Sequence, residues 1–330
     1  MSAPDSLPGS AAGAPARRRR PGLAALFRKE LADHLSSKRF VILLVLLLLV
    51  TTASLAGAVS SLSDGSTQST QFLFLKLFTT SSSSIYSFAT FIAFLGPLVG
   101  ITLGFDAVNN ERALGTLNRL ASQPIYRDDI INAKFLAGAA AVCVLVFSLG
   151  LYGSGLGLLL IGVPPEGEEV LRLLAFLLLC VVYICVWLAL SIFFSVLTRH
   201  TATAALAGMA IWLFLSLFMS LVAGAIANAV YPLDGMEGVY NMLSNYKLEL
   251  GLNRISPYYL FSEAATTILN PSVRSIGVIT MSSLSGAISS ALPFTQSLLL
   301  VWPHLVVMAA LAAAGFAVSY ISFMRQEIRA

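Results

Sequence analysis

Six long apolar stretches in this 330-residue sequence restrict what the chain can fold into. A helix that crosses the hydrocarbon core of a bilayer needs about 20 mostly apolar residues. Charged residues make up only 11% of the chain, whereas a soluble domain carries roughly 25%. The sequence therefore predicts an all-α integral membrane protein with six transmembrane helices. The predicted spans are roughly residues 40–60, 86–106, 134–163, 171–197, 202–230 and 298–324.

Two N-terminal segments precede the first span. Residues 1–21 are rich in Ala, Pro, Gly and Ser and end in a run of arginines, so we expect a disordered basic tail. In residues 22–39 the apolar side chains fall on one helical stripe and the charged ones on the other side, which indicates an amphipathic interfacial helix. Residues 40–330 would then form the six-span membrane domain.

The lysines and arginines are distributed unequally between the two sides of the membrane. With the N-terminus inside, fifteen of the 20 fall on inner segments, and the outer segments hold only Lys76, Arg172, Lys247, Arg254 and Arg274. The positive-inside rule then predicts a multi-pass protein of the cytoplasmic (inner) membrane with both termini in the cytoplasm. Because this asymmetry accounts for the net charge of +4, we expect contacts with membrane lipid and none with nucleic acid.

The longest outer segment covers residues 231–297, directly before the last span. Within it, Ser256 and Pro257 have the pattern of an N-cap followed by proline at the first helical position, and Asn270 precedes a proline that would end the helix. These signals predict an extracytoplasmic helical insertion.

Charged residues on the inner side concentrate in the loop between the second and third spans, where residues 106–124 read DAVNNERALGTLNRLASQP. Leucines recur on one face of residues 109–123, which predicts a short amphipathic helix that Pro124 ends. Asp128 or Asp129 could cap the helix that leads into the third span. The loop is therefore predicted to present a charged helix at the inner membrane surface.

This loop closely resembles that of the type-2 ABC transporter permeases. The likeness rests on Asp106, then Glu-Arg, Gly-Thr-Leu and Pro, then an Arg-Asp pair and a lysine at the start of the next span. It extends from about residue 22 to the end of the chain, and it includes the permeases that accompany multi-copper-enzyme and nitrous-oxide-reductase maturation. The resemblance implies that residues 109–123 are a coupling helix that docks on a separate ATP-binding subunit, and that the chain forms a homodimer or pairs with a related permease.

The resemblance also implies which residues contact the ATP-binding subunit. The interfacial helix would add a second contact through Arg28 and Glu30. The residues that match the family's coupling segment are Asp106, Glu111, Arg112, Gly115, Thr116, Leu117, Pro124, Arg127 and Asp128.

The sequence predicts no catalytic, cofactor or metal site in this chain. None of the five lysines follows a glycine, so the phosphate-binding pattern G-x-x-x-x-G-K-[ST] is absent. ATP and Mg²⁺ are therefore expected on the partner subunit. The three histidines are scattered over separate segments, which does not favour a metal centre.

The function implied by the resemblance is that of the permease subunit of an ATP-driven exporter. No span carries an ionisable residue near its centre, which argues against a proton- or ion-coupled carrier and favours an amphipathic or apolar substrate. Tyr183, Trp187 and Ser191 share one face of the fourth span. They could line the substrate path or pack against a neighbouring helix.

Two alternatives stay open. An ABC-type membrane partner could relay ATP hydrolysis to an extracytoplasmic protein, for example in metalloenzyme maturation, without bulk transport. A more remote alternative is a rhomboid-like intramembrane serine protease, with Ser154 as the nucleophile and His304 as the base.

Overall fold

The structure is a computed structural model that describes residues 21–64, 72–81, 85–116, 126–162, 164–271 and 292–326. Within these ranges the chain forms helices joined by short connections, and none of the described residues is in a strand. The elements are α1 (Pro21–Ser36), α2 (Lys38–Asp64), α3 (Leu73–Thr79), α4 (Phe88–Gly104), α5 (Asn109–Ala113), α7 (Arg127–Ile161), α8 (Gly167–Leu197), α9 (Thr201–Leu213), the π-helical turn η1 (Phe214–Phe218), α10 (Met219–Val230), α11 (Gly235–Asn253), α12 (Pro257–Leu269) and α14 (Phe294–Arg325).

Six helical stretches among the described residues are long and apolar enough to cross a membrane. The prediction of an all-α membrane protein with six spans is therefore confirmed. The fifth span is continuous through α9, η1 and α10, and the third begins at Arg127, earlier than predicted. The six stretches are Lys38–Ser63, Phe88–Ala113, Arg127–Ile161, Gly167–Leu197, Thr201–Val230 and Phe294–Arg325.

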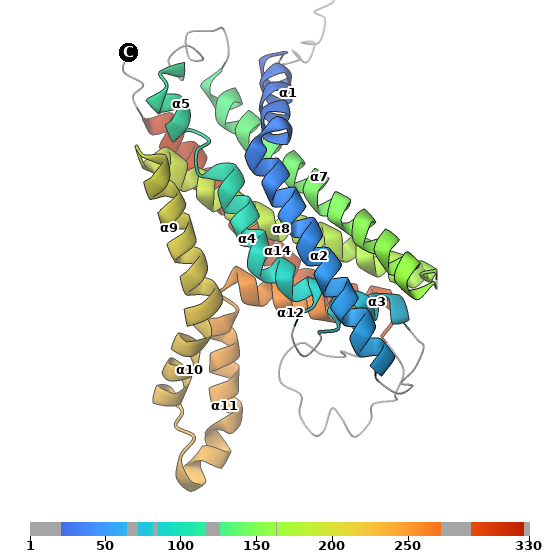
Figure 1. Ribbon diagram of the computed structural model, residues 1–330. Helices are drawn as coiled ribbons and strands as arrows, with labels where there is room; N and C mark the ends of the chain where they lie inside the picture. Colours follow the sequence, from blue (N-terminus) through green and yellow to red (C-terminus); the bar gives the residue numbers. More distant parts are fainter. Residues whose placement is uncertain are drawn as a thin grey trace, which may run out of the picture.

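Helix α8 lies at the centre of the bundle, where it packs against α4, α7, α12 and α14 (Figure 1). Gly96, Gly100 and Gly104 form a stripe on the face of α4 that meets α8. A Cβ atom on Gly100 would lie only 2.6 Å from the carbonyl oxygen of Ile184. Small residues at four-residue spacing let the two backbones touch, which is how helices gain van der Waals contact in a membrane.

The bundle has two distinct ends (Figure 1). Helices α1 and α5 lie at one end together with the C-terminal end of α14, and we call this the α5 end. The opposite end carries α3 and α11 and is called the α11 end. There α10 and α11 run side by side as an arm that extends beyond the other helices.

The described part of the predicted outer insertion is helical. Helix α12 begins at Pro257 and ends at Leu269, as Ser256 and Asn270 predicted. Helix α11 precedes it and was not predicted from the sequence. The predicted basic tail before residue 21 and residues 272–291 lie outside the described residues.

Arg172 fastens the helices together near the α11 end. Its guanidinium is fully buried near the start of α8. It donates hydrogen bonds to the carbonyl oxygen of Ile268 at 2.9 Å, to Ser297 Oγ at 3.1 Å and to Glu168 Oε1 at 2.8 Å. Because every one of these partners accepts, a single cation joins α8 to α12 and to the start of α14.

Candidate functional site

The segment predicted to dock on a partner begins where α4 ends. A turn over residues 105–108 leads into α5, and Ser195 Oγ on α8 accepts hydrogen bonds from the backbone N–H groups of Val108 at 2.9 Å and Asn109 at 3.3 Å. These N–H groups lie at the start of α5, where backbone N–H groups have no hydrogen-bond acceptor within the helix. The beginning of the segment is therefore fastened to the central helix.

Helix α5 is shorter than the sequence predicted. It ends at Ala113, and Gly115 follows with φ +68°. Glycine adopts this left-handed conformation without a Cβ penalty and commonly follows the last turn of a helix. The helical pattern over residues 109–123 therefore did not predict the break at Gly115. Residues 117–125, including Leu117 and Pro124, lie outside the described residues.

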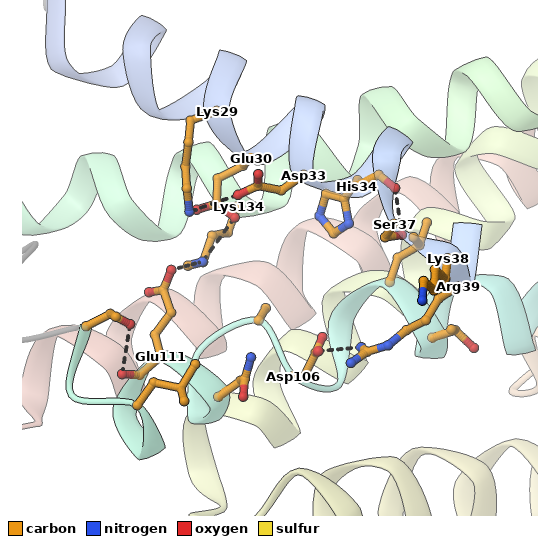
Figure 2. A pocket seen from close by; sticks show the side chains of 16 residues that line it. Lys29, Glu30, Asp33, His34, Ser37, Lys38, Arg39, Asp106, Glu111 and Lys134 are labelled. Atoms are coloured by element: carbon orange, nitrogen blue, oxygen red, sulfur yellow. Dashed lines mark hydrogen bonds and ion pairs between the residues drawn. The ribbon is translucent and has the colours of Figure 1, made fainter. Parts of the chain in front are cut away.

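Five charged side chains form a ladder between α5, α7 and α1 (Figure 2). Lys134 Nζ on α7 lies 2.8 Å from Glu111 Oε1 on α5 and 3.1 Å from Glu30 Oε2 on α1. Lys29 Nζ continues the ladder, at 3.1 Å from Glu30 Oε1 and 3.0 Å from Asp33 Oδ2. We call this set, Glu111–Lys134–Glu30–Lys29–Asp33, the charge ladder.

The inner part of the charge ladder is shielded from water. The Lys134 side chain is 5% exposed, and those of Glu30 and Glu111 are 11% and 14% exposed. Ion pairs with so little exposure are screened much less than surface pairs. The ladder therefore fixes α5 against α1 and α7 more firmly than solvated side chains would.

Charge pairing governs the pKa values at the α1 side of the ladder. Burial alone would raise the pKa of Glu30, but Lys134 and Lys29 outweigh it and hold that pKa below its usual value. Burial likewise opposes the charged form of Lys29, yet Asp33 and Glu30 raise its pKa above the usual value. Both groups are therefore charged at neutral pH. Burial lowers the pKa of His34, which lies beside them.

A cavity of about 680 Å³ opens between α1 on one side and the end of α4 with α5 on the other. The charge ladder lines it, and so do Asp106, Asn110 and Leu114 (Figure 2). The side chains of Asp106 and Arg39 form an ion pair at the end of the cavity near Lys38. The cavity thus lies within the predicted docking region, and most of the residues that line it are charged or polar.

Other predicted docking residues are fastened to the end of α14. Arg112 hydrogen-bonds to the side-chain amide oxygen of Gln326. Arg127 donates to the Gln326 carbonyl oxygen at 2.9 Å and lies over the Phe323 ring at 5.8 Å. Asp128 lies in the first turn of α7, where the helix dipole stabilises its negative charge. Neither Asp128 nor Asp129 is the N-cap residue of α7, because the helix begins at Arg127 and Tyr126 is the N-cap.

Two of the predicted docking residues, Gly115 and Arg28, face outward, and so does the neighbouring Leu114. Leu114 is 69% exposed, no atom lies within 4 Å of the position that a Cβ on Gly115 would take, and Arg28 is exposed. Thr116 Oγ1 donates to the Glu111 carbonyl oxygen at 3.2 Å. The exposed tip around Leu114 and Gly115 is therefore available to a partner, whereas Glu111 and Glu30 have internal partners. Docking by these residues stays a prediction.

The three residues predicted for a substrate path are buried in this conformation. Tyr183 Oη donates to the Ala93 carbonyl oxygen at 2.7 Å and Ser191 Oγ to that of Ile101 at 2.9 Å, both on α4. Trp187 is fully buried between them along α8. Their position here is that of packing residues, and a role in a substrate path would require α4 and α8 to separate.

His304 on α14 does not pair with a serine. Its Nε2 lies 2.7 Å from Glu263 Oε2 on α12, and Glu263 also accepts two hydrogen bonds from Arg254. No bond joins it to Ser154 in the described part of the chain. The serine-protease alternative therefore lacks the nucleophile–base contact that it requires.

Sequence reasoning placed Lys134 at the start of a span but did not assign it to the site. It also missed Ser195, Arg39 and Gln326. Spacing alone gives no sign of these contacts, because 104 residues separate Glu30 from Lys134 and 87 separate Val108 from Ser195.

Six spans, with a short charged helix fixed to three of them, define a multi-pass membrane protein. The chain belongs to the ABC-2 transporter family, because the family model described as "ABC-2 family transporter protein" matches residues 24–328. It is a membrane permease subunit of an ABC transporter. In general, such permeases are the membrane components, and a separate subunit hydrolyses ATP.

Two similar proteins carry the name "Probable ABC transporter permease protein NosY". The one from Pseudomonas aeruginosa is 29% identical over 214 residues, which cover 62% of this chain and 71% of that protein. The one from Stutzerimonas stutzeri is 30% identical over 143 residues, which cover 43% of this chain and 46% of that protein. The alignment thus spans less than half of the second relative.

Proposed function

We propose that this chain is the permease subunit of an exporter that moves an amphipathic or apolar substrate outward. A separate ATP-binding subunit, which holds ATP and Mg²⁺, docks on the segment around residues 109–123 at the cytoplasmic side. Closure of that subunit on ATP shifts the spans and opens a route at the interface with a second copy or a related permease. Both termini lie in the cytoplasm, and the membrane is the cytoplasmic one.

The charge ladder is the observation that supports this proposal most directly. A helix of five residues has almost no stability of its own. The ladder and Ser195 fasten α5 to α1, α7 and α8, while Leu114 beside it is 69% exposed. A stiffly mounted segment with an exposed tip is suited to pass a displacement from a docked subunit to several spans at once.

The test is purification of the tagged chain from its native membrane, followed by identification of any bound ATP-binding protein and measurement of its ATPase activity. Leu114→Asp should release that protein or uncouple its ATP hydrolysis, without destabilising the fold, because the side chain is mostly exposed. Tyr240→Asp on α11 is the matched control, since Tyr240 is 86% exposed at the opposite end. If no ATP-binding protein co-purifies under mild detergent conditions, the proposal fails.

The second candidate is an ABC-type permease that relays ATP hydrolysis to an extracytoplasmic protein without bulk transport. The observation that favours it is an exposed apolar stripe on α11, made of Val239, Met242, Leu243 and Tyr246 at helical spacing. Reconstitution in sealed vesicles separates the two functions. The exporter moves a labelled amphiphile across the bilayer, and Met242→Asp in the stripe leaves that movement intact. The relay moves none, and its effect on an outer partner depends on α11.

A further inference from the structure

Glu111 lines the cavity beside α5, and one oxygen of its carboxylate is buried with no hydrogen-bond partner among the described residues. Glu111 Oε1 accepts from Lys134 Nζ at 2.8 Å, but Glu111 Oε2 is buried without a partner. Both oxygens of Glu30, by contrast, are engaged, by Lys29 and Lys134. An unsatisfied buried carboxylate oxygen is costly, and its pairing with a donor recovers that cost.

The charge ladder also carries an uncompensated negative charge. It contains three carboxylates and two ammonium groups, and Lys134 is shared between Glu30 and Glu111. Arg39 does not offset this charge, because it pairs with Asp106. Lys38 lies at the other end of the cavity from Glu111 in Figure 2. The part of the cavity next to Glu111 therefore favours a cation.

The size and lining of the cavity indicate a side chain rather than a bare ion. Its volume of about 680 Å³ lies within the range of pockets that hold sizeable ligands. Asn110 and Leu114, both exposed, lie at its α5 side next to the tip of the proposed docking segment. An extended basic side chain from a protein docked on this tip could enter alongside α5.

We propose that the ATP-binding subunit inserts a basic side chain, best an arginine, into this cavity. The Glu111 carboxylate then turns towards the cavity, and the inserted group donates a hydrogen bond to Glu111 Oε2. Arginine fits better than lysine because its planar fork can bond a carboxylate and a neighbouring acceptor together. The inserted cation neutralises the ladder and connects the partner to Lys134 and α1 through Glu111. This inference rests on the proposed function, since it assigns the chemistry of the docking contact.

The first experiment places a photo-crosslinking amino acid at position 110 and identifies the crosslinked peptide of the co-purified ATP-binding subunit by mass spectrometry. That peptide should contain the inserted arginine or lysine. The second measures the dissociation constant between the purified permease and purified ATP-binding subunit. Glu111→Gln should weaken binding about 10- to 100-fold, because a hydrogen bond to a charged group is lost.

Glu30→Gln is the matched control. This variant removes the negative charge of the other carboxylate that pairs with Lys134, so it measures how far a loosened charge ladder weakens binding. It does not change the unpartnered oxygen of Glu111. The inference requires Glu111→Gln to weaken binding clearly more than Glu30→Gln. It also requires recovery of binding when Glu111→Arg is combined with replacement of the identified basic residue by glutamate.

The outcomes separate this inference from the proposed function. If the ATP-binding subunit binds and Leu114→Asp releases it, but Glu111→Gln and Glu30→Gln weaken binding equally, the docking proposal stands and the inserted side chain is refuted. A crosslinked peptide without a basic residue refutes it as well. If no ATP-binding subunit binds at all, both proposals fall together.

Discussion

Replacement of Lys134 by methionine tests whether the charge ladder holds α5 in place. Methionine keeps most of the length and apolar character of the side chain but removes the ammonium group. Glu30 would keep Lys29 at 3.1 Å, whereas Glu111 would lose its ion-pair partner while only 14% exposed. Loss of one partner of a buried ion pair costs about 3–5 kcal/mol. We expect the lower end, about 3 kcal/mol, because Glu30 remains paired.

The cost should appear as easier local opening of α5, which hydrogen–deuterium exchange of the purified protein in detergent measures. A loss of about 3 kcal/mol corresponds to a roughly 100-fold faster exchange of the protected amides of α5. The relevant amides are those of Arg112 and Leu114, which bond to the carbonyl oxygens of Val108 and Asn110. Exchange in α8 should change far less.

Two further variants, a rescue and a control, test the cause of the faster exchange. Adding Glu111→Gln to Lys134→Met should recover much of the protection, because the orphaned charge is removed. Arg39→Met breaks an ion pair whose arginine is 54% exposed, so it should cost less than about 1 kcal/mol. If α5 exchanges at the wild-type rate in Lys134→Met, the ladder does not hold the segment and the reasoning is wrong.

Three other predictions concern packing, the buried arginine and pH. Gly100→Ala should lower the melting temperature of the helical circular dichroism signal, at a cost of about 1–3 kcal/mol, because its Cβ would meet the Ile184 carbonyl oxygen at 2.6 Å. Gly155→Ala should melt at or above the wild type, since nothing lies within 4 Å of the added carbon. Arg172→Lys should not restore the stability lost in Arg172→Met, because an ammonium cannot reach the separate acceptors that the guanidinium joins. Equal melting of Arg172→Lys and the wild type would contradict this. Burial lowers the pKa of His34 in the folded state, so the unfolded chain binds the proton more readily, and stability should fall as the pH drops from about 6.5 towards the folded-state pKa. His34→Gln should flatten that part of the curve of melting temperature against pH.

The spans could be predicted because the bilayer imposes length and hydropathy on each of them. The start of α12 could be predicted for a different reason, since proline is favoured at the first helical position. The stripe of Gly96, Gly100 and Gly104 was also present in the sequence as a regular spacing of four. That spacing signals a close helix contact, although it does not say that α8 is the partner.

The contacts of the site could not be predicted, because they depend on which helices become neighbours. Glu111 is part of a recognisable motif, and its charge suggested an exposed contact with a partner. The structure instead pairs one of its oxygens with Lys134, which the sequence showed only as a cation at the start of a span. Periodicity assigns a residue to a face of its own helix, but it does not identify the group that this face meets.

The internal partners of Glu111 and Glu30 are compatible with a docking role for the segment. A five-residue helix that carried only solvated charges would unfold locally when a partner pulled on it, and the displacement would not reach the spans. Here the pull would act on α8 through Ser195, on α7 and α1 through Lys134, and on α14 through Gln326. The residues that hold α5 would then determine transmission as much as those that touch the partner. Under the proposed function, Lys134→Met should therefore leave the proposed docking at Leu114 largely intact while it weakens the proposed link between ATP hydrolysis and transport.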